Sequence, residues 1–204
     1  MSGYPIVLDG DSIAAVVVGG GRVAERKVRA LLAAGARVRL VAPGISDALR
    51  ELARSTSRCT LIERAYESDD LAGATLAFAA TDQRDVNARI AGDARRDGIL
   101  LNIADDGAHG DFVTPALHES GGLMIAVTTG GVPTAAARIR DAIAERFDER
   151  YAHALGQLAG LRSAMLESGD REGWRRAVDA LLSDGFCESV ESGTIIQEMA
   201  GWRC

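Results

Sequence analysis

Residues 14–27 read Ala14-Ala15-Val16-Val17-Val18-Gly19-Gly20-Gly21-Arg22-Val23-Ala24-Glu25-Arg26-Lys27. A short run of branched apolar residues leads into three glycines, and an amphipathic helical pattern follows them. This order is typical of a buried parallel strand, a tight turn and the start of a helix. The spacing Gly19-x-Gly21-x-x-Ala24 fits the dinucleotide-binding pattern, in which the first glycine allows the turn and the second lets the backbone approach a pyrophosphate. The stretch therefore predicts dinucleotide binding; the alternative is a glycine-rich turn that binds nothing.

More short apolar runs follow, and helical patterns lie between most of them. The expected strands cover residues 38–42, 59–64, 76–80 and 99–104, and the expected helices cover 23–34, 45–54 and 86–96. Strands that alternate with helices predict a parallel, doubly wound α/β sheet. Ligands bind such sheets outside the carboxyl ends of the strands. The polar residues at the ends of the later strands are therefore candidate site residues: Thr81, Asp82, Asn102 and Asp105.

The alternation stops after Gly107. Two strands are expected over residues 111–115 and 123–128, followed by a second glycine turn and a helix over 134–147. A helix that starts after a glycine turn is a second candidate anion site. From Asp148 onward the pattern is helical. The sequence thus divides into a dinucleotide-binding domain (1–110), a small α+β segment (111–147) and a helical domain (148–204).

Composition narrows the class of protein. The chain has 204 residues and a net charge of −6 without a basic run, which argues against nucleic acid as a partner. No apolar segment approaches the roughly 20 residues of a membrane span. Residues 1–10 lack the cationic and apolar regions of a signal peptide. We expect no membrane partner and a cytoplasmic location.

The cysteines and histidines predict no metal centre. Three cysteines at wide spacing, Cys59, Cys187 and Cys204, suggest reduced thiols rather than disulfides. The three histidines show no metal-ligand spacing. Lys27 is the only lysine beside 22 arginines. Its place after the glycine turn suggests a specific role; the alternative is a solvated lysine in the first turns of the helix.

The glycine stretch is the first of several motifs that occur in a fixed order along the chain. They are Val18–Lys27, Ala79–Asp82 with Val86-Asn87, Asn102–Asp105, Asp111-Phe112-x-x-Pro115 and Met124–Gly131. This ordered set resembles the precorrin-2 dehydrogenase/sirohydrochlorin ferrochelatase family, which also forms the N-terminal half of bifunctional siroheme synthases. The resemblance covers about residues 4–147, and the tail matches only loosely.

The resemblance implies a Rossmann-like domain that uses NAD as the hydride acceptor and converts precorrin-2 to sirohydrochlorin, on the path to siroheme or cobalamin. Some members also insert ferrous or cobaltous ion. It implies a homodimer in which residues 111–147 exchange strands, a segment too small to bury its own apolar face. The resemblance implies four contacts with the cofactor, made by Arg22, Val23, Pro43 and Gly44. With the two glycines and the residue after the fourth strand, the predicted cofactor site is Gly19, Gly21, Arg22, Val23, Pro43, Gly44 and Thr81.

The resemblance also assigns Asp105 as the catalytic carboxylate, where it could accept the proton released on dehydrogenation or the pyrrole protons released when metal enters. The alternative is a turn or capping aspartate. A substrate with many carboxylates calls for cationic groups. The predicted substrate-binding residues lie at the second glycine turn and on its helix, namely Thr129, Gly130, Gly131 and Arg138. For the arginine, the alternative is a solvated helix face.

Two departures from common patterns stand out. The family usually reads Gly-x-Ser-Pro where this chain reads Gly131-Val132-Pro133-Thr134, so the serine is absent. The residues after the second strand, Val41-Ala42-Pro43, also lack the acid that often holds the ribose of NAD. These residues alone do not separate NAD from NADP. A different class of function, a non-catalytic dinucleotide-binding sensor, is the alternative to the enzyme.

Overall fold

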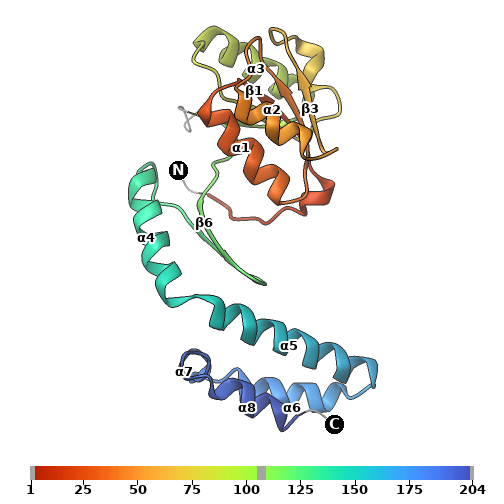
Figure 1. Cartoon of the computed structure of the whole chain (residues 1–204), viewed down its shortest axis with the longest axis vertical. Coiled ribbons are helices and arrows are strands. Elements are labelled where there is room, and N and C mark those ends of the chain that lie inside the picture. The colour runs from red at the N-terminus through yellow and green to blue at the C-terminus, as the bar shows by residue number, and fades with distance from the viewer. Residues whose placement is uncertain (1–2, 105–108, 203–204) are drawn as a thin grey trace. The chain divides into compact units, whose positions relative to one another are not determined.

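The computed structural model describes residues 3–104 and 109–202. The chain divides into two compact units, Met1–Thr114 and Pro115–Cys204 (Figure 1). Each unit has its own hydrophobic core. Among the described residues, no helix combines the length and the apolar character that a bilayer crossing requires.

A five-stranded sheet organises the first unit. Its strands are β1 (Ala14–Val18), β2 (Arg37–Val41), β3 (Cys59–Ile62), β4 (Leu76–Ala79) and β5 (Leu100–Ile103), in the spatial order β3-β2-β1-β4-β5. Every neighbouring pair is parallel. The central strand β1 contains only alanine and valine, as expected for a strand that is buried on both faces. The strand order reverses between β1 and β4, so the switch point of the sheet lies between them.

Helices cover both faces of this sheet. Helices α1 (Arg22–Ala33) and α2 (Asp47–Arg54) pack on one face, and α3 (Arg84–Asp97) packs on the other. Because side chains alternate along a strand, Val17 belongs to the core under α1, whereas Val16 belongs to the core under α3. Two short 3-10 turns complete the unit: η1 (Gly10–Ser12) precedes β1, and η2 (Ser68–Leu71) lies between β3 and β4. The predicted doubly wound α/β fold is confirmed.

Helix α1 begins directly after the glycine turn. Gly21 is its N-cap residue, with φ −96° and ψ −171°, and no side chain caps the helix. Its buried stripe consists of Ala24, Lys27, Val28 and Leu31, at the spacing of one helix face. The small side chain of Ala24 is fully buried, which allows the helix to lie close to the sheet.

The predicted strand over residues 111–115 is wrong. The N–H groups of Asp111 and Phe112 both donate to the carbonyl of Leu101 in β5, at N···O distances of 2.7 and 3.4 Å. Two donors on one acceptor do not make a regular ladder, and Pro115 has no N–H with which to extend one. The first strand of the second unit starts immediately after that proline.

The second unit begins with an antiparallel hairpin of β6 (Ala116–Ser120) and β7 (Leu123–Val127). The helices that follow are α4 (Pro133–Arg146), α5 (Glu149–Glu167), α6 (Arg171–Leu181), α7 (Phe186–Ser192) and α8 (Thr194–Ala200). Helices α5 to α8 share one apolar core. The predicted strand over residues 123–128 and the predicted helical tail are thus present, while the three-part division at residues 110 and 147 stays a prediction.

Candidate functional site

A cleft of about 640 Å³ lies at the carboxyl ends of β1, β2 and β4. This is the switch point of the sheet, where doubly wound folds bind ligands. All seven residues predicted for the cofactor line the cleft: Gly19, Gly21, Arg22, Val23, Pro43, Gly44 and Thr81. Their placement brings the glycine turn, the end of β2 and the end of β4 into one site. Their contacts with a cofactor stay a prediction, which this placement supports.

The three glycines of the turn serve different purposes. Gly19 has a φ of 129°, which side chains rarely adopt, and a Cβ there would overlap the carbonyl of Ala80. A Cβ on Gly20 would overlap the carbonyl of Gly44. A Cβ on Gly21 would meet no atom within 4 Å. The fold itself therefore requires the first two glycines, whereas Gly21 keeps space open in the cleft, as the close approach of a pyrophosphate requires.

The first turn of α1 borders this space, because Gly21, Arg22 and Val23 all line the cleft. The first N–H groups of an α-helix have no partner within the helix, and they carry a partial positive charge. No side chain caps them here. They are therefore free to hold a phosphate. The residues present fit the dinucleotide that the glycine pattern predicts.

The turn after β4 forms the opposite rim of the cleft. The Thr81 hydroxyl Oγ1 lies 2.7 Å from Oδ1 of Asn87, and the side-chain amide of Asn87 donates to the Thr81 carbonyl at 3.0 Å. The N–H of Gln83 donates to the same hydroxyl oxygen at 3.2 Å. The Thr81 hydroxyl therefore uses its hydrogen bonds within the turn itself. We therefore expect Thr81 to serve a cofactor through its backbone.

Asp105, the predicted catalytic carboxylate, lies outside the described residues. The chain just before it reaches the cleft, because Ala104 is one of the lining residues and its N–H donates to the Ala79 carbonyl at 3.0 Å. Asn102 is buried, and its Nδ2 donates to the Phe112 carbonyl at 2.9 Å. Within residues 3–104 and 109–202, Oδ1 of Asn102 has no hydrogen-bond partner. The role of Asp105 stays a prediction.

The predicted substrate-binding residues belong to the second unit. They lie around the turn before α4 and on that helix: Thr129, Gly130, Gly131 and Arg138. Gly130 and Gly131 have φ values of 60° and 112°, and Thr129 Oγ1 donates to the Val132 carbonyl at 2.6 Å. Arg138 is exposed and forms no ion pair among the described residues, whereas its neighbour on the helix, Arg140, pairs with Asp141. In the described part of the chain, no three His, Cys, Asp or Glu side chains are grouped as metal ligands would be.

Sequence reasoning missed two parts of the cleft wall. Ala65 and Tyr66 line it from the connection between β3 and β4, a stretch with no helical or strand periodicity. Lining residues beside the predicted motifs were also missed, among them Gly20 and Ala42. Gly20 could have been found, because it lies between the two glycines of the dinucleotide-binding pattern. No pattern in the sequence marks Ala65 or Tyr66.

Lys27 is buried between α1 and the sheet, so the alternative of a solvated lysine is wrong. Its Nζ donates to Oγ1 of Thr114 at 2.6 Å and lies 5.6 Å from the centre of the Phe78 ring. Burial, with a smaller contribution from Arg26, lowers the pKa of the ammonium group from 10.5 to about 8. The lysine thus ties α1 to the last residue of the first unit.

This burial predicts an unusual pH dependence of stability. Between the folded pKa of about 8 and the unfolded value of 10.5, the unfolded chain binds more protons at Lys27 than the folded chain does. Stability therefore rises with pH in this window, and the cost of the buried charge is fully present below it. Relative to Lys27→Met, the wild type should gain about 2 kcal/mol of unfolding free energy between about pH 7 and about pH 10.5, since partial solvation reduces the full effect. Urea unfolding of both proteins at both pH values measures this; a difference that does not change with pH contradicts it.

Comparisons with known proteins agree with this geometry. A family model described as "Putative NAD(P)-binding" matches residues 6–116. The siroheme synthase of Ectopseudomonas mendocina is 43% identical over 147 residues, which cover 72% of this chain and 30% of that protein. The siroheme synthase of Pseudomonas fluorescens is 41% identical over 193 residues, which cover 91% of this chain and 39% of that protein. This chain thus spans less than half the length of these relatives. A solved structure, "SirC, precorrin-2 dehydrogenase", shares the fold with a TM-score of 0.75 at 24% identity, covering 97% of this chain and 99% of that one.

Proposed function

This chain belongs to the NAD(P)-binding family, and from that premise we propose that it oxidises precorrin-2 to sirohydrochlorin with NAD⁺ as the hydride acceptor. The observation that carries the proposal is the cleft at the switch point, whose walls hold all seven residues expected to contact the cofactor. The siroheme synthases that resemble the chain by sequence, and the fold shared with a precorrin-2 dehydrogenase, favour this substrate.

The chemistry divides between cofactor and protein. Dehydrogenation removes a hydride and a proton from the substrate, and bound NAD⁺ supplies the hydride acceptor. The chain contributes the anchor for the pyrophosphate at Gly21 and the first turn of α1. We assign acceptance of the proton to the carboxylate of Asp105. In the sequence, Asp105 comes two residues after the end of β5 and directly after Ala104, which lines the cleft.

For the substrate we propose the second glycine turn and its helix. Precorrin-2 carries many carboxylates, and the uncapped N-terminus of α4 together with Arg138 offers positive charge to them. Arg138 suits this role better than Arg140, because an ion pair with Asp141 already neutralises Arg140. The family's serine is replaced here by Pro133, which is the first residue of α4. Pro133 has neither a hydroxyl nor a backbone N–H, so this position itself offers a ligand no hydrogen-bond donor.

A direct assay tests the function. Purified protein is mixed anaerobically with precorrin-2 and NAD⁺, and NADH formation is followed by absorbance; NADP⁺ is tested in parallel. Ferrous or cobaltous ion is then added as a substrate, and metal insertion is followed separately. We expect NADH to form with NAD⁺. Tight NAD⁺ binding without NADH formation would instead favour a non-catalytic sensor.

We also propose a homodimer built on the second unit. A two-stranded hairpin has two open edges and is rarely stable alone. Here Leu117, Met124, Val132 and Ile139 are apolar and exposed, at 39%, 48%, 56% and 45%. An isologous partner would cover them. Light scattering at micromolar concentration should give twice the chain mass of 21.4 kDa, and a mass of one chain would rule the dimer out.

We also propose a cytoplasmic location, where thiols stay reduced. Cys59 and Cys187 are free, in agreement with this location.

A further inference from the structure

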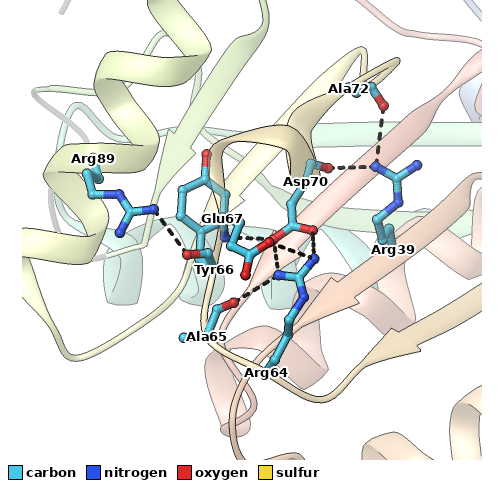
Figure 2. Close-up of polar contacts among 8 residues, drawn as sticks. All are labelled: Arg39, Arg64, Ala65, Tyr66, Glu67, Asp70, Ala72 and Arg89. Atoms are coloured by element: carbon cyan, nitrogen blue, oxygen red, sulfur yellow. Dashed lines mark hydrogen bonds and ion pairs between the residues drawn. The ribbon is translucent and has the colours of Figure 1, made fainter.

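The connection from β3 to β4, residues 63–75, crosses one face of the sheet without an α-helix. Irregular backbone needs partners for its polar groups. Three arginines supply them by donating to its carbonyl oxygens (Figure 2). The pairs are Arg39 with Asp70 (2.6 Å), Arg64 with Ala65 (2.9 Å) and Arg89 with Tyr66 (3.1 Å). The backbone of this connection is therefore held in place from β2, from α3 and from within itself.

A buried carboxylate within the connection accepts hydrogen bonds from two other residues of the same connection. Asp70 is 4% exposed. Its two oxygens accept from the two Nη atoms of Arg64 at 2.7 and 2.8 Å, and the N–H of Glu67 donates to it at 2.8 Å (Figure 2). Burial alone would raise the pKa of Asp70, but these hydrogen bonds outweigh burial and hold the pKa below its usual range. The carboxylate is thus charged and fully engaged near neutral pH.

Tyr66 joins the connection to α3. Its ring is buried, and its hydroxyl donates to Oδ2 of Asp93 at 2.9 Å. The other oxygen of Asp93 accepts from Nη1 of Arg96 at 2.7 Å. The guanidinium of Arg89 lies 5.3 Å from the Tyr66 ring centre. Burial and the hydrogen bond to Asp93 raise the pKa of Tyr66 well above its usual range, so the hydroxyl stays a donor.

This rigid connection meets the cleft at only two adjacent residues, Ala65 and Tyr66. Arginines occupy both of their carbonyls. Neither of their backbone N–H groups donates a hydrogen bond to another described residue. The two N–H groups are therefore free to donate to a ligand, whereas each carbonyl already accepts one bond from an arginine. Adenine presents ring nitrogens that accept such bonds.

The glycine turn sets which half of a dinucleotide reaches this wall. With the pyrophosphate at Gly21, one nucleoside lies toward β2 and β3 and the other toward β4 and β5. In doubly wound folds the adenosine ribose lies at the end of β2. Here that end is Ala42-Pro43-Gly44, which has no carboxylate to bind the ribose. Recognition of adenosine must come from another part of the cleft, and Ala65 and Tyr66 are the lining residues that follow β3, the strand beside β2.

We propose that Ala65 and Tyr66 form the seat of the adenosine half of NAD(P), and that Asp93 is a positioning residue that holds this seat through the Tyr66 hydroxyl. The proposal concerns the cofactor alone. It therefore does not depend on which substrate the enzyme oxidises.

The test measures the two halves of the cofactor separately. Calorimetry gives the affinity for NAD⁺, and ligand-observed NMR gives the affinities for AMP and for nicotinamide mononucleotide. Ala65 is exposed, so Ala65→Trp should fold normally and fill the seat. We expect it to weaken NAD⁺ and AMP by about tenfold or more and to leave the mononucleotide unchanged. Tyr66→Phe should weaken NAD⁺ and AMP by about fivefold.

Variants of Asp93 separate positioning from general stability. Asp93→Ala should weaken AMP about as much as Tyr66→Phe, and Asp93→Asn should restore binding, because its amide oxygen still accepts from the hydroxyl. The double variant Tyr66→Phe/Asp93→Ala should bind no more weakly than Asp93→Ala alone, since both changes remove the same Tyr66–Asp93 bond.

A matched control exists in the second unit. Tyr151 is also buried, and its hydroxyl donates to Oε1 of Glu191 at the same 2.9 Å. Tyr151→Phe should leave all three affinities unchanged. The proposal is overturned if folded Ala65→Trp binds AMP as the wild type does. It is also overturned if Tyr66→Phe weakens AMP and nicotinamide mononucleotide equally, since that would indicate a general distortion of the cleft.

Discussion

Gly21→Val is expected to abolish NAD⁺ binding while the protein stays folded. The backbone of Gly21 is extended, a conformation that valine adopts readily, and a Cβ there meets no protein atom within 4 Å. The added side chain would instead occupy the space that the pyrophosphate needs. We expect the affinity for NAD⁺ to fall by at least about 100-fold, the equivalent of about 3 kcal/mol. Calorimetry measures the affinity, and circular dichroism confirms the fold.

The neighbouring glycine provides the matched control. In Gly20→Val the new Cβ would overlap the carbonyl of Gly44, so this variant should lose stability by several kcal/mol, about as much as a severe core substitution. Identical substitutions at adjacent positions should thus fail for different reasons, one in binding and one in folding. Unchanged NAD⁺ binding in Gly21→Val would remove the cofactor from this turn.

Asp105→Ala is expected to lower the rate of NADH formation from precorrin-2 by about 100- to 10,000-fold, the usual cost of losing a general base. Folding and NAD⁺ affinity should remain nearly intact, because a single carboxylate adds no apolar area to the core. The measurement is anaerobic NADH formation, with metal insertion followed as a second reaction. NAD⁺ titration of the same variant shows that the cofactor site is preserved.

Asp106→Ala removes the same charge one residue later and serves as the control. It should cost far less if Asp106 only shapes the turn. Near-wild-type rates of both reactions in Asp105→Ala would make that aspartate structural, and His109 would be the next residue to test. Loss of metal insertion alone would assign Asp105 to the chelatase reaction and leave dehydrogenation to the well-placed cofactor.

The parallel sheet could be predicted because its central strands are buried on both faces. Such strands must be short apolar runs, and Val16, Val17 and Leu40 illustrate the pattern. The glycine turn was equally visible, since only glycine can occupy positions where a Cβ would meet a carbonyl. Together they located the carboxyl edge of the sheet, and with it the residues of the cleft that lie next to a strand.

The rest of the site depends on partners that are distant in sequence. Ala65 and Tyr66 reach the cleft because Arg89 and Asp93, more than 20 residues away along the chain, hold the Tyr66 carbonyl and hydroxyl. No local pattern encodes such bonds. The same reason explains Lys27, whose burial follows from its bond to Thr114, 87 positions later. Periodicity marked the face of α1 on which it lies but not the depth to which its ammonium group is buried.

The burial of Lys27 makes it a reporter of local opening in the first unit. It carries the only ε-amino group in these 204 residues, and that group is enclosed between α1 and Phe78. An amine-directed reagent should therefore modify it mainly when α1 lifts from the sheet or the unit unfolds. The rate of modification would therefore measure how often the glycine turn and its helix separate from β1. A dinucleotide bound at that turn should slow the labelling, which reads out occupancy of the cleft without any enzymatic turnover.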